Sequence, residues 1–355
     1  MPSRPTALIA LLAIFLLLIV GITYSQHPDE GWNEIGIKFS FFIFPMLALL
    51  LPKVNREEVT SVHHAFVAGC FLFMTITLAH GIFITLNHGD WYYLTYDRLS
   101  WYMHPTYAAT YQSISLFILM NEWIKTHAWS FRKWLLSCSI LIALVFIALL
   151  SSKAGYLCAL LVIVFAVFRA LAVGLGVSRI ISATTIAAAV FILTIVALPT
   201  TSARVEHAVN DIRTGETEDL HTESSGDHTS STQVRLVTWG GAWTILRQNP
   251  FGAGTGDTQP ILNSLYEQQS EHYAAKREFN AHNQFLQTGA EIGWFGLAAL
   301  FLALGSLWVV GQNEPTARLF VLLCALNFLF ESFLEVQAGI VFFSFWVLVY
   351  SKLSK

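Results

Sequence analysis

The sequence predicts an all-α polytopic membrane protein with about ten transmembrane helices and one large periplasmic loop that contains short helices. Of its 355 residues, 55% are hydrophobic and only 12% are charged, which is more apolar and less charged than soluble proteins. The apolar residues gather into long runs, and a single long polar segment interrupts them near the C-terminal side. These observations favour a membrane-embedded helical frame with one water-exposed insertion.

Each predicted helix is an apolar run bounded by charged residues, Pro or Gly. Because a helix needs about 20 apolar residues to cross a bilayer, runs near that length are counted as spans. No small-residue cleavage site follows the first run, so we expect that helix to be retained. The expected helices cover residues 5–24, 35–52, 62–87, 105–122, 133–151, 154–174, 179–198, 284–310, 316–333 and 337–351.

Lysine and arginine predict the orientation, because these residues are enriched in cytoplasmic loops. With a cytoplasmic N-terminus, the short outer loops contain only Arg98 and Lys153. The inner side then contains Arg4, Lys53, Arg56, Lys125, Arg132, Lys133, Arg169, Arg179, Arg318, Lys352 and Lys355. This bias requires an even number of helices, with both termini in the cytoplasm of a bacterial inner membrane.

The chain divides into three parts on this topology. Residues 1–198 hold helices one to seven, residues 199–283 form the large periplasmic loop, and residues 284–355 hold helices eight to ten. Within the loop, residues 213–233 have almost no large apolar side chains, so a mobile segment is expected there. From Val234 to Leu246 apolar residues recur at helical spacing, which predicts a helix capped by Ser231 or Thr232.

Composition excludes several classes of function. The net charge is −3, whereas a nucleic-acid-binding protein needs a basic surface. The four cysteines lie in apolar runs without CxxC spacing, which indicates neither a disulfide framework nor a zinc site. No DxD-like carboxylate pair stands near Arg235 or His282, so we expect no metal or other cofactor.

Three side chains beside the outer surface suit glycan transfer. Because nucleotide sugars are absent outside the cytoplasm, a donor there must arrive activated, for example as a glycan on a lipid diphosphate. A diphosphate leaving group needs cations, and Arg235 is the first candidate, with Lys153 of the run SSKAG as the second. His282 is the candidate general base, because the predicted helix N-terminus beside it favours a neutral imidazole.

Two motifs in this region resemble those of a known family. The histidine motif H-[NSQ]-x9-G-x-x-G of the O-antigen ligase family is matched by His282, Asn283, Gly293 and Gly296. The upstream run resembles the arginine-containing helix and N-P-[LF]-x-G-x-G turn of that family and of the related O-antigen polymerases. That run includes Arg235, Trp239, Asn249, Pro250, Phe251, Gly252, Gly254 and Gly256. The two motifs closely cover roughly 65 residues.

The resemblance implies a metal-independent, inverting glycosyl transfer from undecaprenyl diphosphate. It assigns action on the acceptor to His282 and diphosphate binding to Arg235. A second family arginine usually lies in an S-R-[AG] stretch, and here Lys153 stands at that place. Lysine keeps the charge but lacks the planar fork of arginine.

Several of these signals have structural interpretations as well. His282 is also consistent with a residue that packs at the membrane boundary, and Arg235 with Trp239 is consistent with an aromatic and basic belt. The glycines at 252, 254 and 256 favour a tight turn. Charges inside a membrane are costly, so Glu331 and Glu335, one turn apart near the outer end of the ninth predicted span, are expected to face a wet cavity or to pair with Lys38, Lys153 or Arg98. Together with Asn283 they are candidate supporting residues of the site.

The sequence therefore favours a glycosyltransferase that moves O-antigen from undecaprenyl diphosphate to lipid A-core or another glycan acceptor, among membrane lipids. An O-antigen polymerase that joins repeat units on the same carrier is the alternative. A lipid-linked glycan transporter or flippase is the alternative of another class. A transporter is expected to carry ionisable groups near the midplane of two repeated halves, whereas the candidate residues lie on one predicted side and no internal repeat is visible.

Overall fold

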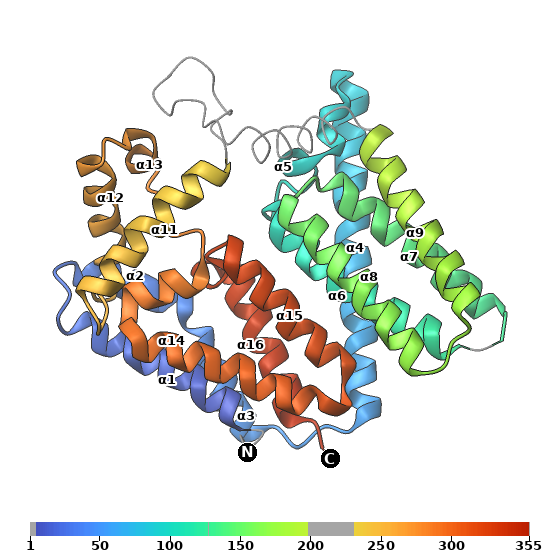
Figure 1. Cartoon of the computed structure of the whole chain (residues 1–355), viewed down its shortest axis with the longest axis horizontal. Coiled ribbons are helices and arrows are strands. Elements are labelled where there is room, and N and C mark those ends of the chain that lie inside the picture. The colour runs from blue at the N-terminus through green and yellow to red at the C-terminus, as the bar shows by residue number, and fades with distance from the viewer. Residues whose placement is uncertain (1–4, 127, 198–230, 355) are drawn as a thin grey trace. The chain divides into compact units, whose positions relative to one another are not determined.

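A computed structural model describes residues 5–126, 128–197 and 231–354, and these residues form helices and turns without a β-strand. One isolated bridge pairs Val54 with Leu353. The chain forms two compact units (Figure 1). The first contains Met1–Asn55 and Asp211–Lys355, and the second contains Arg56–Asn210. The predicted all-helical class is therefore confirmed.

The first unit contains a bundle of apolar helices. α1 lies along α14, and α3 packs against α16 (Figure 1). Large aromatic side chains fill the space beside α16, where Phe320, Trp346 and Tyr350 are fully buried and in ring contact. The helices of this bundle are α1 (Thr6–Ile22), α2 (Pro28–Lys38), α3 (Ser40–Leu50), α14 (Gln284–Val310), α15 (Pro315–Phe330) and α16 (Gln337–Lys352).

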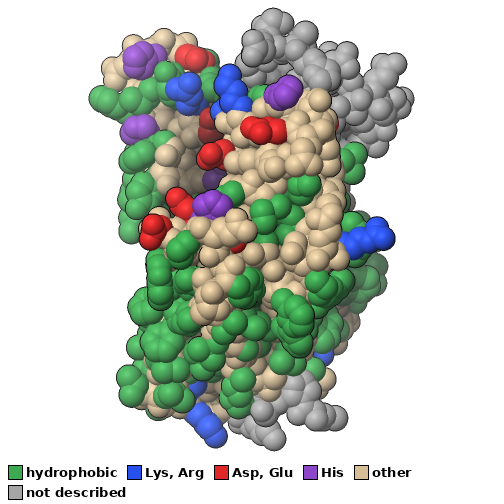
Figure 2. Space-filling view, turned by 90° about the vertical axis from the view of Figure 1, so that its left-hand side faces the viewer, with side chains coloured by type: hydrophobic (Ala, Val, Ile, Leu, Met, Phe, Trp, Pro, Cys, Tyr) green, Lys and Arg blue, Asp and Glu red, His purple; other side chains and the backbone are tan. Residues whose placement is uncertain are grey.

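Three further helices, which are less apolar, cover one end of this bundle. They are α11 (Ser231–Gln248), α12 (Thr258–Gln268) and α13 (His272–Lys276). α11 packs on α14, and α12 packs on both α11 and α13, with Leu262 and Tyr266 of α12 fully buried between them. In Figure 2 apolar side chains dominate the lower part of the visible surface, whereas acidic and histidine side chains gather toward the top. This distribution suits a bundle in lipid with a cap in water.

The second unit is built around α6 (Pro105–Lys125). This helix contacts α4, α7 and α8 and buries 16 of its 21 residues. Two of its polar side chains, Thr110 and Ser113, donate to backbone carbonyls four residues earlier, and His104 caps its first turn. The other elements are α4 (Arg56–His88), η1 (Trp91–Leu94), α5 (Tyr96–Leu99), α7 (Phe131–Leu149), α8 (Lys153–Ala172) and α9 (Val177–Ala197).

All ten predicted segments contain helix, but the expected number of spans is not supported. Six helices in the described residues are long and apolar enough to cross a membrane. α1, α15 and α16 have only 16 or 17 residues, fewer than the roughly 20 that a bilayer requires. α6 is interrupted by polar residues. The structure thus supports a helical membrane protein with six candidate spans.

The predicted periplasmic loop is described only in its second part. Residues 198–230, with most of the predicted mobile segment, lie outside the described residues. α11 already includes Ser231 and Thr232, so these residues belong to the helix and do not precede it. The helix ends at Gln248, directly before Asn249 and Pro250. The division into residues 1–198, 199–283 and 284–355 by membrane side stays a prediction.

The glycine turn after α11 fills a break in α14. Within α14, Ile292 and Gly293 leave helical geometry, and Gly293 has φ +70°. Backbone hydrogen bonds from the turn replace the missing helical ones: Ala253 N–H donates to Ala290 O at 2.8 Å, and Trp294 N–H donates to Pro250 O at 3.0 Å. A Cβ on Gly252 would collide with the Glu291 carbonyl. The predicted tight turn is confirmed, and close backbone approach explains the glycines there.

On the other side of this turn, Asp257 forms hydrogen bonds with the connection between α1 and α2. Its carboxylate accepts hydrogen bonds from the Ser25 hydroxyl at 2.8 Å and from the backbone N–H groups of Gln26 and His27 at 2.8 and 2.9 Å. Burial acts to raise the Asp257 pKa, but these hydrogen bonds outweigh it and leave the pKa below its usual value. The turn is thus held on both sides.

Candidate active site

His282 lies in a tightly held loop before α14. Its backbone is left-handed, with φ +44°, a conformation that is uncommon outside glycine and costs energy. The His282 N–H donates to Asn280 Oδ1 at 3.0 Å, and the neighbouring Ala281 is fixed by Thr238 of α11 and Gln287 of α14. The strained backbone is thus imposed by contacts with two helices, and it fixes the direction of the imidazole.

Arg235 reaches the same place from α11. Its Nε donates to the carbonyl of Phe330, the last residue of α15, at 3.2 Å. One turn further along α11, Trp239 Nε1 donates to the His282 carbonyl at 3.4 Å. The helical spacing of Arg235 and Trp239 therefore lets one face of α11 contact both the end of α15 and the histidine loop.

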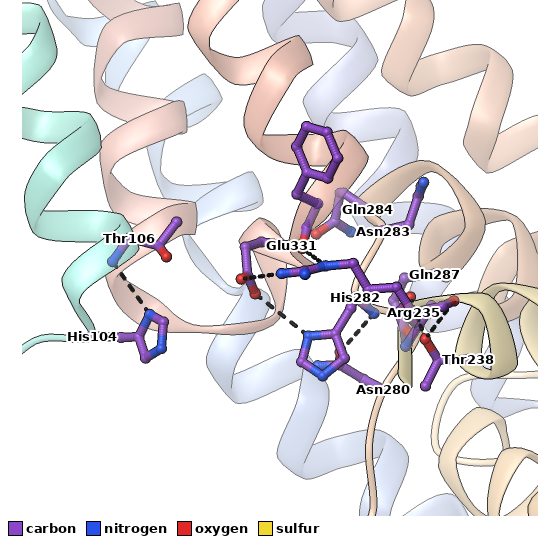
Figure 3. A network of polar contacts seen from close by, with 12 residues as sticks. His104, Thr106, Arg235, Thr238, Asn280, His282, Asn283, Gln284, Gln287 and Glu331 are labelled. Atoms are coloured by element: carbon purple, nitrogen blue, oxygen red, sulfur yellow. Dashed lines mark hydrogen bonds and ion pairs between the residues drawn. The ribbon is translucent and has the colours of Figure 1, made fainter. Parts of the chain in front are cut away.

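Glu331 joins the two predicted residues. One carboxylate oxygen lies 3.5 Å from Arg235 Nη2, and the other lies 3.5 Å from His282 Nδ1 (Figure 3). The side chains of Arg235, His282 and Glu331 are 23%, 28% and 16% exposed. Arg235 and His282 are thus brought together across one carboxylate, at a place that water reaches.

The other predicted supporting residues have defined positions. Asn283 caps α14 by accepting from Leu286 N–H at 3.0 Å, and its amide donates to Leu329 O. Glu335 pairs with Lys38 at 2.8 Å, a partner that the sequence interpretation had offered. Glu331 and Glu335 do not share a helix face, because α15 ends at Phe330 and Glu331 is extended. Lys153 opens α8 in the second unit, and its role in diphosphate binding stays a prediction.

A second charged cluster lies inside the first unit, and the sequence interpretation named only part of it. Lys38 of α2 contacts Glu291 at 2.6 Å, Glu335 at 2.8 Å and Glu34 at 3.5 Å. The side chains of Lys38 and Glu291 are only 4% and 3% exposed. Three carboxylates around one buried ammonium connect α2, the break in α14 and the loop before α16. We call these four residues the Lys38 cluster.

Gln284 connects the Lys38 cluster to the candidate site. Its side-chain amide donates to Glu335 at 3.0 Å, and its side-chain carbonyl accepts from Leu334 N–H. The segment from Glu331 to Glu335 is therefore held by Lys38 and by the first turn of α14, which begins two residues after His282. The signal in the sequence was Glu291, the one charged residue of the apolar helix α14, where an isolated charge is costly, together with Lys38 just before the apolar helix α3.

The site lies at one end of the first unit's bundle. α16 begins just after Glu335 and ends at Lys352, so its two ends are roughly 24 Å apart at 1.5 Å per residue. Lys352 donates to Ala48 O, and its neighbour Leu353 pairs with Val54 beside Lys53. Lys352 thus lies at the opposite end of α16 from the candidate site, and which end faces the cytoplasm stays a prediction.

This geometry suits base catalysis assisted by a cation. Because Nδ1 of His282 faces Glu331, Nε2 is the ring nitrogen directed away from that carboxylate. A carboxylate on Nδ1 favours the tautomer whose Nε2 accepts a proton and stabilises the imidazolium that results. The contact of 3.5 Å is long for a hydrogen bond, as is common in active sites without substrate. Arg235 supplies a planar cation for an anionic ligand.

Comparisons with known proteins identify a family that part of the chain resembles. No curated protein matches the chain. Residues 138–301 match the family model described as O-antigen ligase. The matched region includes Lys153, Arg235 and His282, whereas Glu331 and Lys38 lie outside it. The predicted resemblance is therefore confirmed: this part of the chain is similar to the O-antigen ligase family.

Proposed function

We propose that this protein transfers a glycan from undecaprenyl diphosphate to lipid A-core oligosaccharide at the periplasmic face of the bacterial inner membrane. The family supports a membrane glycosyltransferase of the O-antigen ligase or polymerase type. The finer assignment depends on the joint contact of Arg235 and His282 with Glu331, because it unites a cation and a base that are 47 residues apart in the sequence.

In the proposed reaction an acceptor hydroxyl oxygen attacks the anomeric carbon of the donor sugar. A new carbon–oxygen bond forms while the bond from that carbon to the diphosphate oxygen breaks, and the electron pair leaves with the diphosphate. Attack from the opposite side inverts the anomeric configuration. His282 Nε2 takes the hydroxyl proton, and Glu331 stabilises the resulting imidazolium.

Arg235 neutralises the charge that develops on the leaving diphosphate. In the structure its guanidinium already faces Glu331 at 3.5 Å. A diphosphate carries more charge than a carboxylate and offers oxygens for bidentate hydrogen bonds. Donor binding thus replaces a long contact of Arg235 with shorter charge-assisted ones and leaves Glu331 to His282. A role of Lys153 in diphosphate binding stays a prediction from the sequence.

A lipopolysaccharide gel from a strain that lacks the gene tests this function. The proposal predicts bare lipid A-core while lipid-linked polymer accumulates, and complementation with the wild-type gene restores the full ladder. Core that carries a single repeat unit would instead identify an O-antigen polymerase. An unchanged ladder together with lipid-linked glycan held in the cytoplasmic leaflet would identify a flippase.

Metal removal tests the mechanism. Since the proposed reaction uses Arg235 to neutralise the diphosphate, transfer by the purified protein should stay within about twofold of its normal rate in a chelator, well short of the loss of 10² or more that follows removal of a stabilising group. The measurement is glycan transfer to lipid A-core with and without the chelator. Full loss of transfer, restored by Mg²⁺ or Mn²⁺, would contradict the mechanism.

A further inference from the structure

The second unit contains a cavity that the proposed transfer reaction does not use. Its volume is about 550 Å³, within the range of ligand sites. The cavity lies where α6 and α8 end and α7 and α9 begin, a region that Figure 1 shows within the second unit. Small residues of α8 and α9 make the space, namely Ala166, Ala170, Ala183 and Ala187.

The wall of this cavity is mainly apolar and contains two cations. Lys133 is only 4% exposed. Its ammonium donates to the Thr126 carbonyl at 2.6 Å and lies 4.2 Å from the centre of the Trp123 ring. Arg179, at the start of α9, is exposed and close enough to repel Lys133 electrostatically.

Neither cation is neutralised within the described part of the chain. No Asp or Glu lines the cavity, and no ion pair of the described residues includes Lys133 or Arg179. The nearby Glu122 pairs instead with Lys125 and Arg132, both at 2.9 Å. Two unneutralised like charges beside an apolar space repel each other, and an anion between them would remove that cost.

The combination of an apolar cavity with cations at its wall matches an amphiphile with an anionic head group. Basic pockets between membrane helices bind anionic lipid head groups. Trp123 and Trp129 also line the cavity, and tryptophan is enriched at the level of lipid head groups. We propose that this cavity binds an anionic phospholipid, with an acyl chain among the alanines and the phosphate between Lys133 and Arg179.

Native mass spectrometry of the purified, delipidated full-length chain tests the proposal. The protein is mixed with equal amounts of phosphatidylglycerol and phosphatidylcholine that have identical acyl chains. We expect phosphatidylglycerol to be retained on the order of tenfold more strongly, since two cations contribute to its binding. Equal retention of the two lipids would overturn the proposal.

Charge variants locate the site. The double variant Lys133→Gln/Arg179→Gln should lose the preference for phosphatidylglycerol. The matched control Lys125→Gln/Arg132→Gln removes two cations at the same end that do not line the cavity, and it should keep the preference. Because Lys133 is buried, the single variant Arg179→Gln separates lipid binding from folding and should weaken the preference several-fold. If the control pair lost the preference for phosphatidylglycerol to the same extent, the preference would come from the overall surface charge and not from this cavity.

Two further experiments distinguish a bound phospholipid from other possible ligands of the cavity. Ala183→Trp fills the apolar cavity and should reduce retention of phosphatidylglycerol without a change in the thermal unfolding of the protein. Inorganic phosphate at the same concentration as the lipid should not displace it. Displacement by phosphate would indicate a free-anion site, and preferential retention of a polyprenyl phosphate would indicate the carrier lipid. Either result would overturn the proposal.

Discussion

Two charged clusters of the first unit differ in depth and in contact length. In the Lys38 cluster the two shortest contacts are 2.6 and 2.8 Å, and Lys38 and Glu291 are almost fully buried. In the candidate site Glu331 lies 3.5 Å from both Arg235 and His282, and all three side chains are partly exposed. Gln284 lies between the two clusters and contacts the first.

The difference indicates that the two clusters have different roles, one structural and one in substrate binding. A buried ion cluster with short contacts resists change, because removal of one partner leaves uncompensated charge in a low dielectric. A partly exposed cluster with long contacts exchanges partners at a lower cost. We infer that the Lys38 cluster fixes the segment from Glu331 to Glu335, whereas Arg235 and His282 stay available to substrates.

The largest expected effect is on stability, from Lys38→Met. This variant leaves Glu34, Glu291 and Glu335 without their shared cation, which should cost about 3–5 kcal/mol. Thermal unfolding of the purified protein, followed by tryptophan fluorescence, measures the loss. Lys276→Met, on the exposed side of α13, is the matched control and should change little. Equal unfolding temperatures for Lys38→Met and wild type would show that the Lys38 cluster does not hold the fold.

His282→Ala should act on catalysis and leave the fold intact. Removal of a general base typically lowers a rate by about 10²–10⁴. Glycan transfer by the purified variant is the measurement, with thermal unfolding as the check on folding. His272→Ala changes an exposed histidine of α13 and should transfer glycan normally. Transfer above a tenth of the wild-type rate would contradict the role of His282.

Substitutions of Arg235 test how the diphosphate is bound. Arg235→Ala loses hydrogen bonds to a charged group, about 1.5–3 kcal/mol, and should raise the KM for the donor. Arg235→Lys keeps the charge without the fork and should show a smaller loss. Arg247→Ala, at the exposed end of the same helix, should bind the donor normally. Identical losses for the alanine and lysine variants would exclude a bidentate contact.

The smallest expected effect is that of Glu331→Gln, and its direction is informative. Without the carboxylate, Arg235 has no competitor for the diphosphate, so the KM for the donor should fall. His282 loses the partner of its imidazolium, so kcat should fall as well. Each change should be roughly fivefold, since a partly exposed ion pair with long contacts contributes about 1 kcal/mol. Glu267→Gln on exposed α12 is the control. A higher KM would mean that Glu331 positions Arg235 for the donor.

Local patterns explain which parts of the site could be predicted. The helical spacing of Arg235 and Trp239 predicted one face of a helix, and the structure gives that face two partners. His282 and its glycines were found from a motif within one short segment. The long-range consequence of that motif was missed: Gly293 breaks α14, and the glycine turn near residue 252 supplies the replacement hydrogen bonds.

The number of membrane spans could not be predicted from the sequence. Apolar runs located each of the ten helices, because hydrophobicity acts on every residue by itself. Their lengths depend on where a turn or cap ends the helix. α15 ends at Phe330, which frees Glu331 from the helix and turns it toward α11. The apolar composition of this segment does not by itself predict that the helix ends at Phe330.

The sequence by itself determined the helical membrane class, the polar helix that carries Arg235 and the motif around His282, since periodicity and composition act over neighbouring residues. The tertiary structure alone decided that Glu331 stands between them and that Lys38 gathers Glu34, Glu291 and Glu335. The physical reason is that ion pairs and hydrogen bonds depend on contact distance, and these contacts join residues as far as 253 positions apart.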